Sequence, residues 1–387
     1  MKILTAILMS GLLATTVLAA CSSTPKPLGT VAIAPTPAPT PVPTGSPSTA
    51  ATPSPTPHAT PTATPAPSPT PTAGVLASSS IYVAQSADNN ITIYPPNPAG
   101  TVNELPITEI NGSNTGLSTP FAIAVDATGK IYVANRSGGG GSGSVTVYAA
   151  NPIGTVNATP LATIAGSNTG LFNPGGIALD ASGKIYVSNL PNTITVYAAN
   201  PSGTLNETPL ATITGAATGL ASPTGMAFDA AGRLYVANES NASITVYAAN
   251  PSGTLDEVPL ATIVGSNTGL DDPLGVALDA SGQIYAVNSG PGVSAVTVYP
   301  ASPSGTMNEA PLATITGSAT QLGTPISLTL DSTGKIYVLN TYGGGGNNIG
   351  SVTVFAANPS GTLNEAPLGE ITGSNSRMYN PSGIAVH

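Results

Sequence analysis

From residue 75 onward, short apolar runs alternate with turn-forming residues. One stretch, from Gly176 to Thr214, contains the runs GIALD, KIYVSN, ITVYAA and PLATIT. β-Branched and aromatic residues dominate these runs, and Gly, Pro, Asn and Asp separate them, as is typical of strands and turns. Asp180 precedes a three-residue loop that ends in Gly183, which fits a hairpin with a type I turn. The pattern predicts four antiparallel strands in this unit, and no useful helical period follows the first 20 residues.

This unit repeats along the chain. The motif Ile/Leu-Tyr-Val/Ala recurs at steps of 50, 54, 49, 50 and 52 residues, beginning at Ile81, Ile131, Ile185, Leu234, Ile284 and Ile336. Units of four antiparallel strands and about 50 residues are typical of β-propeller blades. A single blade has two apolar faces that only neighbouring blades can cover, so the ring must close. The sequence therefore predicts an all-β, six-bladed β-propeller over residues 75–387.

The two ends of the repeat region predict how the ring closes. The region opens with the second strand of a blade at Ile81, and it ends with a lone inner strand, PSGIAV, from Pro381 to Val386. We expect this C-terminal strand to pair with the first blade. The segment from Val75 to Ala77 competes for the same place, but it lacks the preceding Pro-x-Gly and the Asp turn.

The repeats resemble those of NHL-repeat propellers, whose blades read P-x-G-I-A-V-D-x-x-G-x-I-Y-V-A-N/D. The matching stretches include NPGGIALDASGKIYVSN from Asn173, SPTGMAFDAAGRLYVAN from Ser222 and DPLGVALDASGQIYAVN from Asp272. The stretches from Thr119 and Thr324 lack the glycine. The resemblance covers all six units and implies the propeller fold, whereas this architecture hosts binders, scaffolds and enzymes alike.

The first 20 residues are typical of a signal peptide, with Lys2 followed by an uncharged, mostly apolar run. The sequence Leu18-Ala19-Ala20-Cys21 resembles the bacterial lipobox, which implies that Cys21 is acylated and holds the chain on a membrane. An ordinary cleaved signal peptide is the alternative. Because Ser22 rather than Asp follows the cysteine, the resemblance implies the outer membrane in a Gram-negative host; the other location is the outer face of the cell membrane.

Residues 21–74 form a linker rich in Pro, Thr and Ala, with runs such as PTPAPTPVPT. Such a segment cannot bury a core, and its prolines favour an extended, disordered spacer. We therefore divide the chain into a signal peptide at 1–20, a linker at 21–74 that begins with the lipidated Cys21, and the propeller at 75–387.

Composition narrows the classes of function. The chain has eight Lys and Arg and a net charge of −9, which excludes a basic surface for nucleic acid. Its single Cys excludes a disulfide framework and a Cys-rich zinc site. We predict no cofactor.

Candidate ligand-binding residues lie on the face that carries the loops between strands 2 and 3 and between strands 4 and 1. Five units end their second strand in Asn and one in Gln, namely Gln85, Asn135, Asn189, Asn238, Asn288 and Asn340. These amides form either a polar rim around the channel mouth or caps of the strand-end turns, and capping is favoured. The carboxylates expected on this face are Asp88, Glu239, Asp271 and Asp272; the last two are either half of a metal site or solvated loop residues.

Other recurring residues have structural interpretations. The aspartates that end the inner strands, such as Asp180, belong to the turns, and the glutamates of the NPSGTLNE-type loops, such as Glu207, are solvated. The glycine-rich loops at 136–144 and 341–350 lack the Lys and the following helix of a phosphate-binding loop. They also differ most among the units, as expected either of a binding rim or of unselected surface loops.

Catalysis is difficult to assign because the predicted propeller has no Cys and its only His is the terminal His387. We therefore expect an exported, lipid-anchored binding or scaffold module that recognises a protein or glycan through a polar surface. Two alternatives remain. One is a metal-dependent lyase or lactonase, similar to streptogramin lyases or gluconolactonases, whose site residues cannot be matched here. The other is a purely structural surface protein.

Overall fold

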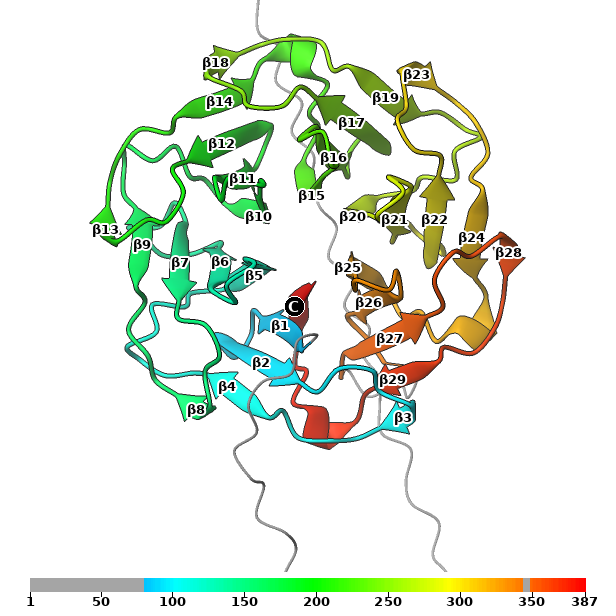
Figure 1. The fold of residues 1–387 in the computed structure, drawn as a ribbon, viewed down its shortest axis with the longest axis horizontal. Coiled ribbons are helices and arrows are strands. Elements are labelled where there is room, and N and C mark those ends of the chain that lie inside the picture. The colour runs from blue at the N-terminus through cyan, green and yellow to red at the C-terminus, as the bar shows by residue number, and fades with distance from the viewer. Residues whose placement is uncertain (1–79, 344–348) are drawn as a thin grey trace, which may run out of the picture. The chain divides into compact units, whose positions relative to one another are not determined.

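The computed structural model describes residues 80–343 and 349–387. These residues form six sheets arranged as blades around a central axis, which confirms the predicted all-β, six-bladed propeller (Figure 1). The expected signal peptide, Cys21, the linker and the segment Val75–Ala77 lie outside the described residues.

Four strands of each blade correspond to the runs predicted from the sequence. The inner strands are β5 (Pro120–Val125), β10 (Pro174–Leu179), β15 (Pro223–Phe228), β20 (Pro273–Leu278), β25 (Pro325–Leu330) and β30 (Pro381–Val386). The second strands are β1 (Ile81–Gln85), β6 (Ile131–Asn135), β11 (Ile185–Asn189), β16 (Leu234–Asn238), β21 (Ile284–Asn288) and β26 (Ile336–Asn340). The third strands are β2 (Asn90–Tyr94), β7 (Ser144–Tyr148), β12 (Thr193–Tyr197), β17 (Ser243–Tyr247), β22 (Ala295–Tyr299) and β27 (Ser351–Phe355). The fourth strands are β4 (Thr108–Ile110), β9 (Ala162–Ala165), β14 (Ala211–Thr214), β19 (Ala261–Val264), β24 (Ala313–Thr316) and β29 (Gly369–Ile371).

Each blade also has a fifth strand, which corrects the prediction of four. These outer strands are β3 (Gly100–Val102), β8 (Gly154–Val156), β13 (Gly203–Leu205), β18 (Gly253–Leu255), β23 (Gly305–Met307) and β28 (Gly361–Leu363). Each lies in what the sequence indicated as a polar loop, and it pairs in parallel with the fourth strand of the preceding blade, as β8 does with β4. The outer strands therefore tie each blade to the one before it.

The ring is closed at two radii. At the inner radius, β30 pairs antiparallel with β1, so that Ile81 lies opposite Val386, which confirms the predicted closure by the C-terminal strand. At the rim, β3 pairs in parallel with β29, with Gly100 opposite Gly369. The first and last units are thus joined by hydrogen bonds at both edges of the ring.

The core lies between the blades. The strand residues Ile131 and Val133 of blade 2 pack with Ile91 and Ile93 of blade 1, and equivalent clusters fill the other interfaces. Burial of these side chains supplies the main favourable contribution to folding, because apolar area removed from water stabilises by about 25 cal/mol per Å². No blade covers its own faces, so the stability of each depends on its neighbours.

The hairpin turn between the first two strands has the predicted aspartate. The Asp126 carboxylate accepts hydrogen bonds from the backbone N–H groups of Thr128 (2.8 Å) and Lys130 (3.0 Å). Burial raises the pKa of Asp126, but the hydrogen bonds that its carboxylate accepts from Thr128, Lys130 and Tyr132 outweigh burial and lower the pKa overall. This aspartate therefore has the structural role that the sequence indicated.

The helices of the described ranges are three one-turn 3-10 segments, η1 (Ala216–Thr218), η2 (Ser318–Thr320) and η3 (Ser374–Ser376). Within residues 80–343 and 349–387, no helix has the length and apolar character needed to cross a membrane.

The closure makes a testable prediction for a chain that ends at Asn380 and therefore lacks β30. This chain loses the buried Ile384, which alone is worth about 2–5 kcal/mol, and it exposes the pairing edge of β1. We expect its melting temperature to fall and the chain to self-associate with rising concentration, as measured by thermal unfolding and light scattering. Leu368→Ala, at a side chain that is 53% exposed, is the control and should change stability by about 0.5 kcal/mol or less. A truncated chain that melts like the full chain and stays monomeric would contradict this closure.

Candidate functional site

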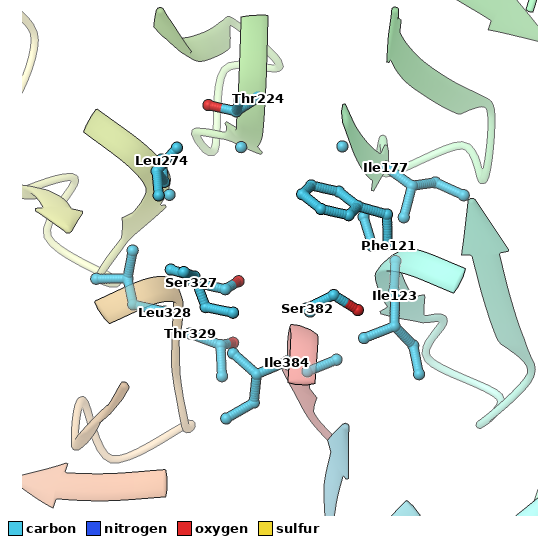
Figure 2. A pocket seen from close by; sticks show the side chains of 18 of the residues that line it. Phe121, Ile123, Ile177, Thr224, Leu274, Ser327, Leu328, Thr329, Ser382 and Ile384 are labelled. Carbon is cyan, nitrogen blue, oxygen red and sulfur yellow. The ribbon is translucent and has the colours of Figure 1, made fainter. Parts of the chain in front are cut away.

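A central channel with a volume of about 620 Å³ runs between the inner strands. All six inner strands contribute to its wall (Figures 1 and 2). Halfway along, one large apolar side chain comes from each blade: Ile123, Ile177, Met226, Val276, Leu328 and Ile384. Further along are Val125, Phe228, Leu278, Leu330 and Val386. The side chains of the channel wall are therefore mostly apolar, whereas the inner strands are edge strands whose unpaired backbone groups add polar surface to the wall. The channel volume falls within the range of about 300–1,000 Å³ typical of small-molecule pockets.

A β-bulge in each inner strand shapes one end of the channel. The pairing between the first and second strands shifts register just after the inner-strand proline in every blade. The residue after the proline is left out of the pairing, and bulges re-aim such side chains. In the six blades these residues are Phe121, Gly175, Thr224, Leu274, Ile326 and Ser382, and all of them line the channel. We call this set the bulge ring. It differs from blade to blade, whereas the surrounding strands are nearly uniform in sequence.

Most hydroxyl groups of the channel wall are engaged by the protein itself. The Ser382 hydroxyl donates to the carbonyl oxygen of Pro120 (2.7 Å) or Ala84 (3.0 Å), and Thr224 lies near two carbonyl oxygens in the same way. The hydroxyls of Ser327 and Thr329 in blade 6 have no hydrogen-bond partner among the described residues. Figure 2 shows both side chains in the channel wall beside Leu328. Among the hydroxyl groups of the inner strands, those left for a ligand are thus confined to blade 6.

One charged residue, Arg136, is found among the described residues that line the channel. It follows β6 directly, and its guanidinium carbon lies 3.2 Å from the centre of the Phe121 ring. Its Nε donates a long hydrogen bond of 3.4 Å to the Pro174 carbonyl oxygen. Burial lowers the pKa of Arg136, while the nearby Glu239 raises it, and an arginine stays protonated in either case. The channel wall therefore carries a fixed positive charge at the bulge-ring end.

The six strand-end amides do not form a rim open to ligands. Gln85, Asn135, Asn189, Asn238, Asn288 and Asn340 are all at most 1% exposed. The Asn238 Oδ1 accepts a hydrogen bond from the Ala221 N–H (3.1 Å), and its Nδ2 donates to the Thr245 hydroxyl (3.0 Å). The other five make equivalent bonds. The amides cap the loop that enters each blade. Their contacts therefore match turn capping, which the sequence favoured over a ligand-binding rim.

The four candidate carboxylates do not converge. Asp88 is exposed in the hairpin of blade 1, and Glu239 is half-buried in blade 4. Asp271 and Asp272 are half-buried in the loop before blade 5, where the Asp271 N–H donates to Asn288 Oδ1. Within the described ranges, no three His, Cys, Asp or Glu side chains lie together as possible metal ligands.

Two buried carboxylates lie elsewhere and were not expected from the sequence. Glu109 and Glu370 occupy the fourth strands of blades 1 and 6, where the other blades have Thr. Glu109 forms an ion pair with Arg377 (2.8 Å), while Glu370 Oε1 has no hydrogen-bond partner among the residues that the structure describes. The sequence signal was visible as TEI and GEI in place of ATI, but periodicity alone does not say that the position is buried.

Comparisons with known proteins add information about the fold alone. No protein-family model matches the sequence, and no curated protein matches it. A protein of unknown function from Bacteroides caccae is similar in structure, with a TM-score of 0.52 and 12% identity over 80% of this chain and 99% of that chain. The WD40 domain of Toxoplasma gondii coronin is also similar, with a TM-score of 0.41 and 11% identity over 78% of this chain and 67% of that chain. The first likeness supports the propeller architecture.

The amide caps generate a prediction for Asn238→Ala. The substitution leaves the Ala221 N–H without its acceptor in a part-buried position, so the free energy of unfolding should fall by about 1–3 kcal/mol in denaturant titrations. The exposed Asn192, which accepts one bond from Ser222, provides the control Asn192→Ala, with an expected loss below about 1 kcal/mol. Equal effects of the two substitutions would argue against a buried capping role.

Proposed function

We propose that this protein is an exported, lipid-anchored β-propeller that binds a small molecule in its central channel and has no catalytic role. The observation that carries the proposal is the chemistry of the channel wall. Its described residues carry no carboxylate, imidazole, thiol or phenol, so proton transfer has no suitable side chain and the Ser and Thr hydroxyls have no neighbouring base to activate them as nucleophiles. A pocket lined mostly by apolar side chains, with a few placed polar groups, is instead typical of ligand binding.

The proposed site differs from the polar protein- or glycan-binding rim expected from the sequence. The bulge ring combines variable side chains with a uniform frame, an arrangement suited to selecting a ligand. The anchor rests on the lipobox-like Leu18-Ala19-Ala20-Cys21, and the NHL-like repeats are in keeping with a binding or scaffold role. In this proposal, the linker holds the binding domain at the cell envelope.

The anchor is tested by growing a bacterial host that produces the full chain with an alkynyl palmitate analogue. We expect label on the wild-type protein in the membrane fraction, and none on Cys21→Ser, because acylation requires the thiol. Ser23→Ala is the matched control and should keep the label. Equal labelling of wild type and Cys21→Ser, or no label on either, would overturn the lipid anchor.

The binding role is tested with the neutral apolar dye Nile red, whose fluorescence rises in apolar surroundings. The full chain with Cys21→Ser, purified without detergent, should bind the dye, and adding Leu274→Thr should weaken binding several-fold because apolar contact area in the channel is lost. Blade 4 already has Thr at this position, as Thr224, so the fold should tolerate the change. Leu312→Thr, at a 48% exposed leucine outside the channel wall, is the control. Equal loss with both variants, or no dye binding, would contradict a ligand site in the channel.

A further inference from the structure

We propose that the channel selects a small apolar carboxylate, with the hydrocarbon part along the inner strands and the carboxylate beside Arg136. This inference rests on the proposed binding function and adds the chemical class of the ligand. It is argued from three features: the apolar side chains of the wall, the unequal bulge ring and the charge of Arg136.

The wall favours a hydrocarbon body. The last four positions of the inner strands carry apolar side chains or glycine in nearly all blades. The Ser382 and Thr224 hydroxyls lie within hydrogen-bond distance of backbone carbonyl oxygens. A sugar or peptide would have to pair its many polar groups with the backbone edges of the inner strands, because few side chains of the wall are free to do so, and each group left unpaired costs about 1–3 kcal/mol. An alkyl or aryl group packs against these apolar side chains and needs no hydrogen-bond partner of its own.

The bulge ring favours an elongated, asymmetric ligand over a symmetric one. Large apolar residues, Phe121, Leu274 and Ile326, come from blades 2, 5 and 6, whereas Gly175 in blade 3 leaves its part of the ring open. Figure 2 shows Phe121 and Leu274 on different sides of the channel, with Thr224 between them. The ring thus has distinct positions for the two ends or two sides of a ligand.

The positive charge of Arg136 favours a negatively charged head group on the ligand. Its terminal amino groups have no hydrogen-bond acceptor within the described part of the chain, so they are available to a ligand. Because Arg136 already covers one face of the Phe121 ring, that face is closed to a ligand cation. Glu239 is the carboxylate that acts on Arg136 electrostatically, and the two do not form an ion pair. A planar carboxylate matches the fork of donors on a guanidinium.

The test uses three ten-carbon probes that differ in the head group: decanoate, decan-1-ol and decyltrimethylammonium. Binding is measured by calorimetry on the full chain with Cys21→Ser, below the micelle concentration of each probe. We expect decanoate to bind about tenfold more tightly than decan-1-ol, since a charge-assisted hydrogen bond contributes about that factor, and the ammonium probe to bind most weakly.

Three variants distinguish the effect of the Arg136 charge from other effects on binding. Arg136→Gln should weaken decanoate about tenfold and leave decan-1-ol unchanged, whereas Leu274→Thr should weaken both. Arg233→Gln is the charge-matched control, because Arg233 lies near Tyr235 away from the channel wall and Gln283 occupies the equivalent place in blade 5. It should leave both affinities unchanged.

Each other outcome decides against the inference in a distinguishable way. Equal affinities for decanoate and decan-1-ol, or no effect of Arg136→Gln, would overturn selection of a carboxylate; if Leu274→Thr still weakened both probes, the binding function would stand. If none of the three probes bound, but Nile red bound and Leu274→Thr weakened its binding, the carboxylate would be rejected and the binding function would stand. Absence of binding in both experiments would reject the channel as a ligand site.

Discussion

Mutual coverage of the blades is the constraint on which the rest of this structure depends. Each sheet has two apolar faces and two pairing edges, and none of these is satisfied within one repeat. Neighbours cover the faces, as Ile123 of blade 2 covers Tyr82 and Ile91 of blade 1. Strand exchange completes the sheets, with β30 completing blade 1 and β3 completing blade 6, while the inner strands remain edge strands on the channel side. Only a closed ring covers the faces and completes all six sheets at once, which explains why so uniform a set of repeats forms one cooperative unit.

The same constraint leaves the channel free to vary. Close approach of the inner strands is possible because their third residue is small: a Cβ on Gly225 would lie 2.7 Å from the Gly275 Cα, which is too near for any side chain. The bulge one residue earlier is outside the ladder, so its side chain takes no part in strand pairing. Some bulge side chains still contact the next blade: Thr224 and Ser382 lie within hydrogen-bond distance of its carbonyl oxygens, and Leu274 packs against the core between blades 5 and 6. Sequence differences in the bulge ring therefore alter the cavity without changing the pairing of the strands.

Local and short-range features were predictable from sequence, and features that depend on neighbouring blades were not. The Asp180 turn and the closure by Pro381–Val386 follow from residues within one unit and from the number of units. The outer strand Gly154–Val156 was missed because its three residues are exposed or half-buried and its partner lies in the preceding blade. Asn135 and its equivalents were correctly placed at strand ends, yet their burial depends on loops 17 residues earlier. The stacking of Arg136 on Phe121 brings a loop residue onto a bulge residue. The spacing of the two residues in the sequence does not indicate this contact.

The closing pair also imposes an order on biogenesis. Ile81 meets Val386, and these residues are among the first and last of the described chain. Blade 1 lacks its inner strand until β30 has left the ribosome, so the ring cannot be completed before then. Contacts between such distant residues are slow to form. The nascent protein therefore remains an open arc with one vacant edge until that strand arrives.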